Sequence, residues 1–290
     1  METMSLSISS SKILIIGASS SIGTSLLKFD KKKKFTGTYF SSKKKNLIKF
    51  DPSKQKISEK FNLNNFSLIV LLQGVTKNDE CVKKKKLSNF VNITLNKKII
   101  DELILQKKKF IFFSTEWVYS GKKKFNSENS KLLPVNLYTR QKLKIEKYIK
   151  KNAKDYFILR LAKTYTNILS DNSFVNNWNK MIKKREKTFK CYKNQFFSPV
   201  FSRDLYRFIL FAEKNKDYGI YNFGGKERFS RIDCLKIFLK LKKIKNFNLV
   251  EQKIPKRFPK DVSLNIDKLR KINFKPSTFE NNLHEIYNIK

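Results

Sequence analysis

The chain has 290 residues, and its 64 Lys and Arg residues outnumber the 24 Asp and Glu residues, which gives a formal net charge of +40. Because His284 is the only histidine, a Ser-His-Asp triad and a multi-histidine metal site are both disfavoured. The cysteines Cys81, Cys191 and Cys234 are far apart and odd in number, which argues against a zinc site or a disulfide framework and favours a reducing cytoplasm.

The positive charge is distributed along the chain and does not form one basic segment. Taken alone, it suggests binding to nucleic acid or to an anionic membrane. The excess of Lys, Asn, Ile and Phe resembles a drift toward A/T-rich codons, which needs no ligand, so we expect weak, salt-sensitive RNA binding but no dedicated nucleic-acid partner. The lysine runs fall at predicted connections or helix ends, at residues 31–34, 43–45, 83–86, 107–109 and 122–124.

No segment has the pattern of a membrane span or a signal peptide. The longest wholly apolar run, Leu68–Leu72, is far too short to cross a bilayer. Residues 1–11 lack the features of a signal peptide, and the apolar run Ile13–Ile16 that follows is too short for its hydrophobic region. We therefore expect no membrane span.

The first predicted element is a buried strand, Lys12–Ile16, which leads through a turn of small residues into a helical pattern. This arrangement suits a pyrophosphate, because the helix N-terminus presents unpaired N–H groups to the anion. Ser20 stands where the usual fingerprint has its middle glycine, and an ordinary strand-to-helix turn is the alternative. The candidate cofactor residues of this turn are Gly17, Ser20, Ser21, Ile22 and Gly23.

Further apolar strands alternate with polar or helical stretches, which predicts a parallel sheet covered by helices on both faces. Such a doubly wound α/β fold binds ligands at the carboxyl ends of its strands. Thr115 ends one predicted strand, and Tyr138 follows it by 23 positions. The predicted strands after the first are residues 35–40, 47–51, 67–72, 110–115 and 156–161.

The residues after the second strand bear on the choice of cofactor. Folds that prefer NAD place an acid at this position to hold the ribose hydroxyls. Here the chain has hydroxyls and cations, among them Ser41 and Lys43, which suit a 2′-phosphate. We predict NADPH over NADH, with a solvated lysine loop as the alternative.

Tyr138 and Lys142 are four residues apart, so on a helix they share one face. A cation beside a phenol favours the phenolate and lowers a pKa that is ordinarily about 10. The spacing can also arise by chance in this lysine-rich chain, since Tyr148 also has a lysine, Lys144, four residues before it. The pair is therefore a candidate acid catalyst whose role depends on its surroundings.

Several motifs together resemble dTDP-4-dehydrorhamnose reductase, a family of the extended short-chain dehydrogenase/reductases. Residues 114–121 (STEWVYSG) resemble its S-T-D-Y-V-F-x-G signature, and residues 134–142 resemble its P-x-N-x-Y-x-x-x-K signature. The resemblance covers nearly the whole chain. Weaker similarities are Thr76 and Asp79, Val91-Asn92, residues 194–200, residues 203–205 and residues 257–264.

The resemblance implies a Rossmann fold and carbonyl reduction. Tyr138 would be the general acid, Lys142 would lower its pKa and bind the nicotinamide ribose, and Thr115 would hold the substrate carbonyl. A positioned acid of this kind is worth roughly 10²–10⁴-fold in rate. The cofactor contacts implied outside the first turn include Asp51, which resembles the family's adenine contact, Gly74 and Thr76; an N-cap is the alternative role of Asp51.

The chain departs from the family pattern around the substrate. Glu116 replaces an Asp, Trp117 replaces a Tyr, and Lys163 stands where the reductase usually has a Trp. Glu116 and Lys163 are candidate substrate contacts, and Lys163 is either the partner of a phosphate or carboxylate or one more surface lysine. The identity of the sugar and of the nucleotide stays open.

The resemblance also implies a discontinuous organisation. We expect residues 1–160 and about 190–215 to form the dinucleotide-binding domain, and about 161–189 and 216–290 to form a substrate-binding lobe. The expected elements of the lobe are a helix over 172–187, a short strand over 220–223 and a helix over 231–242.

Three functions remain open from the sequence. The first is an NADPH-dependent reductase of a nucleotide-linked keto-sugar, which would serve dTDP-rhamnose or other polysaccharide precursor synthesis. The second is an epimerase or dehydratase of the same superfamily, although Trp117 occupies the place of the second acid that dehydratases carry. The third is a non-catalytic subunit resembling the regulatory beta subunit of methionine adenosyltransferase. A homodimer is compatible with each of them.

Overall fold

The computed structural model describes residues 12–255 and 258–288. Residues 1–11, in which we predict no signal peptide, lie outside the described residues. Arg257, the first residue of the family-like segment 257–264, also lies outside them.

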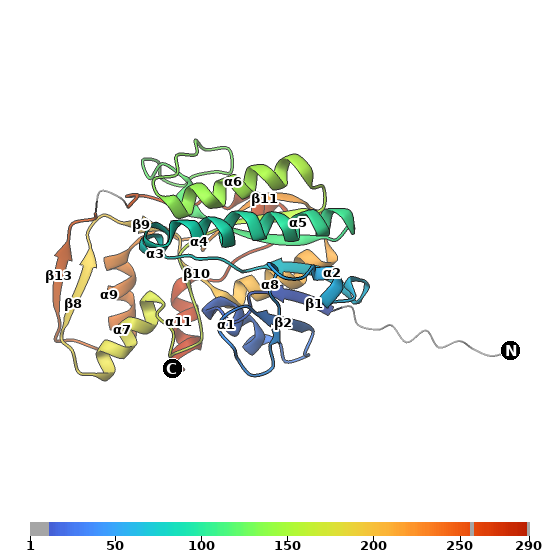
Figure 1. The fold of residues 1–290 in the computed structure, drawn as a ribbon. Helices are drawn as coiled ribbons and strands as arrows, with labels where there is room; N and C mark the ends of the chain where they lie inside the picture. Colours follow the sequence, from blue (N-terminus) through green and yellow to red (C-terminus); the bar gives the residue numbers. More distant parts are fainter. Residues whose placement is uncertain (1–11, 256–257, 289–290) are drawn as a thin grey trace.

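Seven strands of the described chain form one sheet in which every pairing is parallel (Figure 1). The predicted doubly wound α/β fold is therefore confirmed. Thr115 at the end of β5 is paired with Leu161 at the end of β6. The order across the sheet is β11 (Gly219–Phe223), β6 (Tyr156–Leu161), β5 (Phe110–Thr115), β4 (Phe66–Leu71), β1 (Lys12–Ile16), β2 (Phe35–Tyr39) and β3 (Ile48–Lys49).

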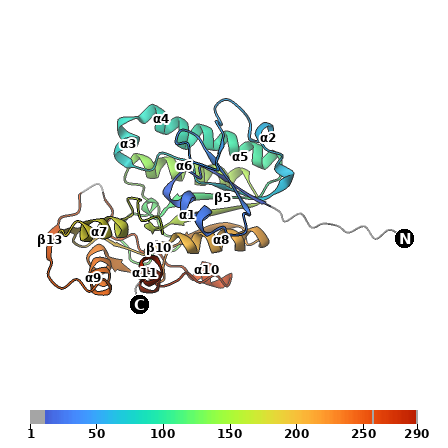
Figure 2. The ribbon, with the colours of Figure 1, turned by 90° about the horizontal axis from the view of Figure 1, so that it is seen from below.

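The central strands are apolar because helices cover the sheet on both faces. Alternate residues of β1 enter two different cores: Ile13 and Ile15 face one core, and Leu14 and Ile16 face the other. The first core is covered by α1 (Ser21–Phe29) and α8 (Ser202–Lys214), the second by α5 (Asn96–Leu105) and α6 (Leu137–Asn152). Figure 2 shows α8 and the α5–α6 pair on opposite sides of β5.

Short elements connect the central strands and helices. A π-helix precedes α5 and continues from α4, so residues 85–105 form one long helical segment. These connecting elements are α2 (Ile57–Lys60), a 3-10 helix (Leu63–Asn65), α3 (Asn78–Lys83), α4 (Lys85–Asn89), the π-helix (Phe90–Leu95) and a second 3-10 helix (Glu116–Val118).

The remaining elements gather on the left in Figure 1 around a third, mostly aromatic core that includes Tyr165, Phe174 and Phe201. The predicted helices 172–187 and 231–242 correspond to α7 (Phe174–Lys183) and α9 (Arg231–Leu241). The other elements of this part are β7 (Thr164–Tyr165) paired with β10 (Val200–Phe201), β8 (Thr188–Tyr192) paired with β13 (Asn248–Gln252), β9 (Phe196–Phe197) paired with β12 (Phe229–Ser230), and α11 (Phe279–Tyr287). The helix α10 (Asp267–Lys271) instead lies against β11 of the main sheet, and its Leu269 belongs to the core that α8 covers.

Two predictions about strands need correction. The strand near 220–223, which we assigned to the substrate-binding lobe, is β11 and extends the main sheet beside β6. Its residues Tyr221 and Phe223 are buried in the core that α8 covers, which explains its place there. The strand predicted over 47–51 is reduced to Ile48–Lys49, two exposed residues at the edge of the sheet.

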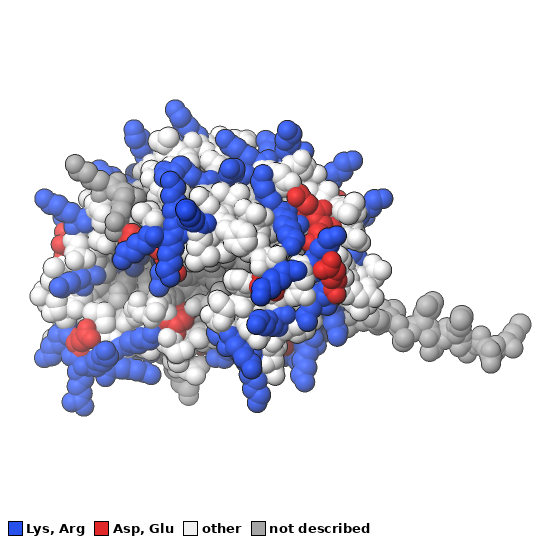
Figure 3. All heavy atoms as spheres, in the orientation of Figure 1, with Lys and Arg blue, Asp and Glu red and all other residues white. Residues whose placement is uncertain are grey.

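Lysine and arginine side chains cover the visible face of the molecule without forming one stripe, whereas acidic side chains are few (Figure 3). The exposed side of α6 illustrates this, because it carries Arg140, Lys144, Lys147 and Lys151. Of the helices in the described ranges, none is both long and apolar enough to cross a membrane.

Candidate active site

Tyr138 and Lys142 lie on α6, whose start is fixed by its sequence. The Asn136 side chain accepts a hydrogen bond from the Thr139 backbone N–H at 3.0 Å, and the Thr139 hydroxyl pairs with the Asn136 backbone in return. This capping box begins the helix at Leu137, so Tyr138 is in the first turn and Lys142 one turn later. The predicted helical spacing of the pair is present.

A cleft of about 660 Å³ brings together much of the predicted site. It opens between the ends of the sheet and the aromatic part, and Figure 3 shows the surface hollowed there, between α3 and α7. The predicted site residues that line it are Ser21, Ile22, Thr76, Thr115, Glu116, Tyr138 and Lys163. Ser41, Lys43 and Asp51 are not among the residues that line it, and follow β2 and β3.

The turn after β1 is tight and closely packed against the neighbouring strand. Gly17 has a φ of 87°, and a Cβ on it would lie 2.8 Å from the Gln73 backbone nitrogen, so no other residue fits. The Ser20 hydroxyl accepts a hydrogen bond from the Gly23 N–H at 3.1 Å and is thereby committed to capping α1. Ser21 and Ile22, the first two residues of α1, line the cleft, so the N-terminus of this helix lies at its wall.

The electrostatics of the Tyr138–Lys142 pair differ from the prediction. Burial, followed by the charges of Glu116 and Cys81, raises the pKa of the Tyr138 phenol above its ordinary value. The Lys142 ammonium donates to the Phe113 carbonyl at 2.7 Å and lies 5.9 Å from the centre of the Tyr138 ring. Burial lowers its own pKa to about 8. The net shift of the Tyr138 pKa is therefore upward, opposite to the shift that we predicted for the pair.

Behind Lys142, Asn92 fixes the loop that follows β4. Its side-chain oxygen accepts from the Val75 N–H at 2.8 Å, and its nitrogen donates to the Val75 carbonyl at 2.9 Å and to Gln141 at 2.8 Å. Gly74 has a φ of 156°, and a Cβ there would meet the Asn92 side chain at 3.1 Å and the Lys142 ammonium at 3.8 Å. The loop with Gly74 and Thr76 is thus held against α6.

Gln141 is a buried residue beside the site that the sequence did not reveal. Its side-chain nitrogen donates to the Ser88 hydroxyl at 3.0 Å and to Asn89 at 2.8 Å, and its oxygen accepts from Asn92. Asn92 lies in the π-helix, a rare geometry that is often found at functional sites. In the sequence, only its position directly before Lys142 could have drawn attention to Gln141.

A buried ion pair anchors the base of the site. Arg160 on β6 binds both carboxylate oxygens of Glu146 on α6, with the shortest contact at 2.8 Å. Ser114 donates a hydrogen bond to the same carboxylate, and Arg160 also donates to Tyr119 at 3.0 Å and to the Glu128 carbonyl at 2.8 Å. This network joins β5, β6 and α6 directly below Thr115.

The substrate side of the cleft contains Glu116 and Lys163. Glu116 is only 4% exposed, and burial raises the pKa of its carboxyl to about 8 against the opposing effect of its own backbone N–H and of Lys163. Lys163 follows β6 two residues after Leu161, the partner of Thr115, and its side chain is exposed within the cleft. Partial desolvation by the walls of the cleft, followed by the charge of Arg231, lowers the pKa of Lys163.

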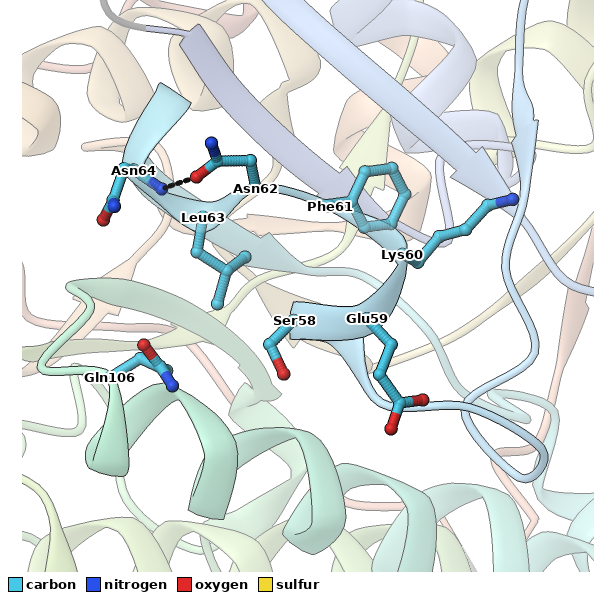
Figure 4. Close-up of a pocket in the computed structure, with 8 residues that line it drawn as sticks. All are labelled: Ser58, Glu59, Lys60, Phe61, Asn62, Leu63, Asn64 and Gln106. Carbon is cyan, nitrogen blue, oxygen red and sulfur yellow. Dashed lines mark hydrogen bonds between the residues drawn. The ribbon is translucent and has the colours of Figure 1, made fainter.

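A second hollow, of about 340 Å³, lies away from these residues, between residues 58–64 and Gln106 (Figure 4). Its Asn62 side chain folds back to accept a hydrogen bond from the Asn64 N–H at 3.1 Å, and Glu59 caps α2 through the Lys56 N–H. These polar groups satisfy local backbone, and no predicted site residue lines the hollow, so we assign it no function.

Solved structures of nucleotide-sugar enzymes share the fold. A dTDP-4-dehydrorhamnose reductase from Bacillus anthracis in complex with NADP has a TM-score of 0.81 and 21% identity over 97% of this chain and 99% of its own. A reductase ortholog from Clostridium acetobutylicum has a TM-score of 0.79 and 22% identity over 96% and 98%. A UDP-N-acetylglucosamine 4-epimerase from Methanobrevibacter ruminantium has a TM-score of 0.83 and 18% identity over 96% and 97%.

None of the curated proteins matches the chain in sequence. Residues 11–290, nearly the entire length, match the family described as RmlD substrate binding domain. This agrees with the resemblance found in the signatures around Thr115 and Tyr138. The chain therefore belongs to the RmlD substrate binding domain family.

Proposed function

We propose that the protein is an NADPH-dependent reductase of a nucleotide-linked keto-sugar. The observation that carries this proposal is the single cleft in which Thr115, Tyr138 and the N-terminus of α1 meet at the carboxyl ends of the parallel strands. Family membership supports an NAD(P)-dependent oxidoreductase. The three cysteines, which are buried and unbridged, support our prediction of a cytoplasmic enzyme.

The residues of the first turn fit a dinucleotide. Gly17 permits the close turn, and the N–H groups of Ser21 and Ile22 are available to a pyrophosphate. A reduced nicotinamide supplies a hydride to the carbonyl carbon when it is bound. Lys142, 5% exposed and next to Gly74, is placed to bind its ribose.

The surroundings of β2 favour NADPH over NADH. Ser41 and Lys43 are exposed after β2, and Lys44 donates to the Thr24 hydroxyl at 2.7 Å, which brings the lysine loop over α1. A hollow of about 760 Å³ beside this loop is lined by Lys28, Lys33, Lys44 and Lys45, with Asp30 as its one acid. The reductase from Bacillus anthracis was solved with NADP. A kcat/KM higher with NADPH than with NADH is the expected result.

Tyr138 supplies the proton in the proposed reaction. Its raised pKa keeps the phenol protonated at neutral pH, and a developing alkoxide is basic enough to take that proton. Thr115 is 8% exposed at the end of β5, where its hydroxyl is placed to hold the carbonyl oxygen. Afterwards the Lys142 ammonium, whose pKa is about 8, stabilises the phenolate.

The decisive experiment follows NADPH absorbance with a panel of nucleotide-linked 4-keto sugars. Tyr138→Phe is expected to retain NADPH binding and to lose roughly 10²–10⁴-fold in kcat. Tyr148→Phe is the matched control, because Tyr148 is on the same helix but outside the cleft. Unchanged turnover in Tyr138→Phe would refute the assignment.

The same assay separates the reductase from an epimerase. An epimerase is the second candidate because the 4-epimerase from Methanobrevibacter ruminantium is as similar in fold as the reductases are. An epimerase would convert its substrate without net consumption of NADPH. A non-catalytic subunit would neither convert the sugar nor consume NADPH.

A further inference from the structure

Two aromatic rings line the cleft beside the candidate catalytic residues. Trp117 follows Thr115 on the second 3-10 helix, and Phe258 comes from the segment between β13 and α10. Their ring centres lie 5.0 Å apart with an angle of 55° between the planes, and Tyr192 meets Phe258 edge-on at 5.9 Å. Both residues remain partly exposed. We call Trp117 and Phe258 the aromatic corner of the cleft.

Phe258 is held in place by the residues that follow it. Pro259 packs against Gly121, which has a φ of 74° and where a Cβ would lie 2.4 Å from the Pro259 Cβ. The Asp261 N–H donates to the Gly121 carbonyl at 3.0 Å. The segment that carries Phe258 is therefore anchored to the loop that follows β5, the strand that ends in Thr115.

Trp117 is tied to the residue that would hold the reacting carbonyl. Its backbone N–H donates to the Thr115 hydroxyl oxygen at 3.3 Å, which caps the 3-10 helix. Two steps along the chain span at most about 7 Å, so the Trp117 backbone stays within that distance of Thr115. Its side chain also packs against the third, aromatic core. The aromatic corner is therefore fixed next to Thr115.

The lining of the cleft suits a sugar at this place. Most of the other lining residues carry polar groups, among them Glu116, Thr164 and Asn172. A pyranose has C–H groups on its faces and hydroxyls around its edge, so an aromatic ring packs against a face while polar groups bind the edge. The sugar carries the carbonyl that Thr115 would hold, whereas a ribose and a diphosphate separate the nucleobase from it. The corner therefore lies beside the sugar.

We propose that Trp117 and Phe258 bind the ring of the substrate's sugar and thereby hold its carbonyl at Thr115 and Tyr138. This rests on the proposed function and adds to it two residues that contact the sugar itself. The two rings exclude water from one face of the sugar and fix its orientation. Removing a ring should therefore weaken the binding of a nucleotide sugar and leave the binding of the nucleotide alone unchanged.

The first test uses tryptophan fluorescence, because the chain has two tryptophans in different surroundings. Trp178 is 5% exposed in the third core, whereas Trp117 lines the cleft. In the NADP⁺-saturated full-length protein, UDP-glucose or dTDP-glucose is expected to shift the emission, whereas UDP or dTDP alone is not. Trp117→Phe should abolish the shift, and Trp178→Phe should retain it. A shift of equal size with UDP or dTDP, or one that survives in Trp117→Phe, would overturn the proposal.

The second test measures affinity by calorimetry on the same NADP⁺ complex. Phe258→Leu should raise the dissociation constant of the nucleotide sugar about 10-fold, whereas Phe258→Tyr, which keeps the ring, should leave it nearly unchanged. Phe247→Leu is the matched control, since Phe247 is exposed, packs against Phe189 of the third core and lies outside the cleft. It should bind as the wild type does.

Three calorimetric results would contradict the aromatic corner. The first is an unchanged dissociation constant in Phe258→Leu. The second is an equal loss of affinity for UDP alone, which would assign the ring to the nucleotide. The third is a nucleotide sugar that binds to the wild type without shifting the emission of Trp117.

The two proposals fail in different ways. If keto-sugars are reduced with NADPH and Phe258→Leu leaves their KM unchanged, only the aromatic corner is wrong. If no nucleotide sugar binds and NADPH is never consumed, the proposed function falls and the aromatic corner falls with it.

Discussion

Arg160 near the end of β6 and Lys163 just after it are three residues apart, yet of the two only Arg160 has an ion-pair partner in the described chain. Arg160 is 3% exposed, and its guanidinium is matched by Glu146, Tyr119 and a carbonyl. Lys163 lines the cleft with an exposed side chain and lacks an ion-pair partner among the described residues. The buried charge with complete partners is therefore structural, and we infer that the exposed charge at the cleft is available to a ligand.

Breaking the complete pair is expected to have the largest effect on stability. Arg160→Met leaves Glu146 buried and uncompensated, which should lower the free energy of unfolding by about 3–5 kcal/mol in urea titrations. Lys193→Met is the matched control, because Lys193 and Glu251 form an exposed pair, and it should cost less than about 1 kcal/mol. Similar losses in both variants would contradict the difference between buried and exposed pairs.

The buried carboxyl of Glu116 should make the free energy of unfolding depend on pH. Because the pKa of Glu116 is raised from 4.5 to about 8, the folded state binds more protons than the unfolded state between those values. Stability should therefore fall as pH rises through this window, by roughly 3 kcal/mol between pH 5.5 and 7.5. Glu116→Gln should remove this contribution, as measured by urea unfolding at each pH; an identical slope in wild type and variant would disprove the assignment.

Replacing Gln141, a buried neutral side chain with several hydrogen bonds, should cause an intermediate loss of stability. Gln141→Leu removes the buried hydrogen bonds that Gln141 makes with Asn92, Ser88 and Asn89, which should cost about 1–3 kcal/mol of stability. Because Asn92 holds the Val75 loop, the KM for NADPH should also rise. Gln106→Leu, at an exposed helix end, is the control, and equal behaviour of the two variants would remove the positioning role of Gln141.

The smallest expected effect has the opposite sign. Lys163→Met removes an exposed charge that has no salt bridge in the described part of the chain, so it should change the free energy of unfolding by less than about 0.5 kcal/mol, toward higher stability, in the absence of ligands. Thermal unfolding of both proteins measures this change. A clear destabilisation would mean that Lys163 is as well compensated as Arg160.

Strongly patterned features were predictable from the sequence. The strands that became β1, β4, β5 and β6 are continuous apolar runs, and such runs indicate buried parallel strands without further information. The Tyr138–Lys142 spacing is likewise a local signal, because both residues lie one turn apart on α6.

Features set by tertiary contacts were not predictable. β8 and β13 pair across more than fifty residues, and both are partly exposed and contain charged residues. Neither the strands nor their pairing could therefore be predicted from local apolar patterns. The role of Gln141 depends on a helix that precedes it by about fifty positions. The raised pKa of Tyr138 follows from burial and from Glu116, which spacing along α6 does not show.

The lysines spread over the surface in Figure 3 have a consequence for the speed of encounter. NADPH and nucleotide sugars are anions, so a molecule with a net charge of +40 draws them in from a distance whatever evolutionary cause produced the lysines. Counter-ions shorten this reach to about 8 Å at physiological ionic strength. Association with both proposed ligands should therefore be fast in dilute buffer and should slow steeply as salt is added, while the rate of the bound complex stays the same.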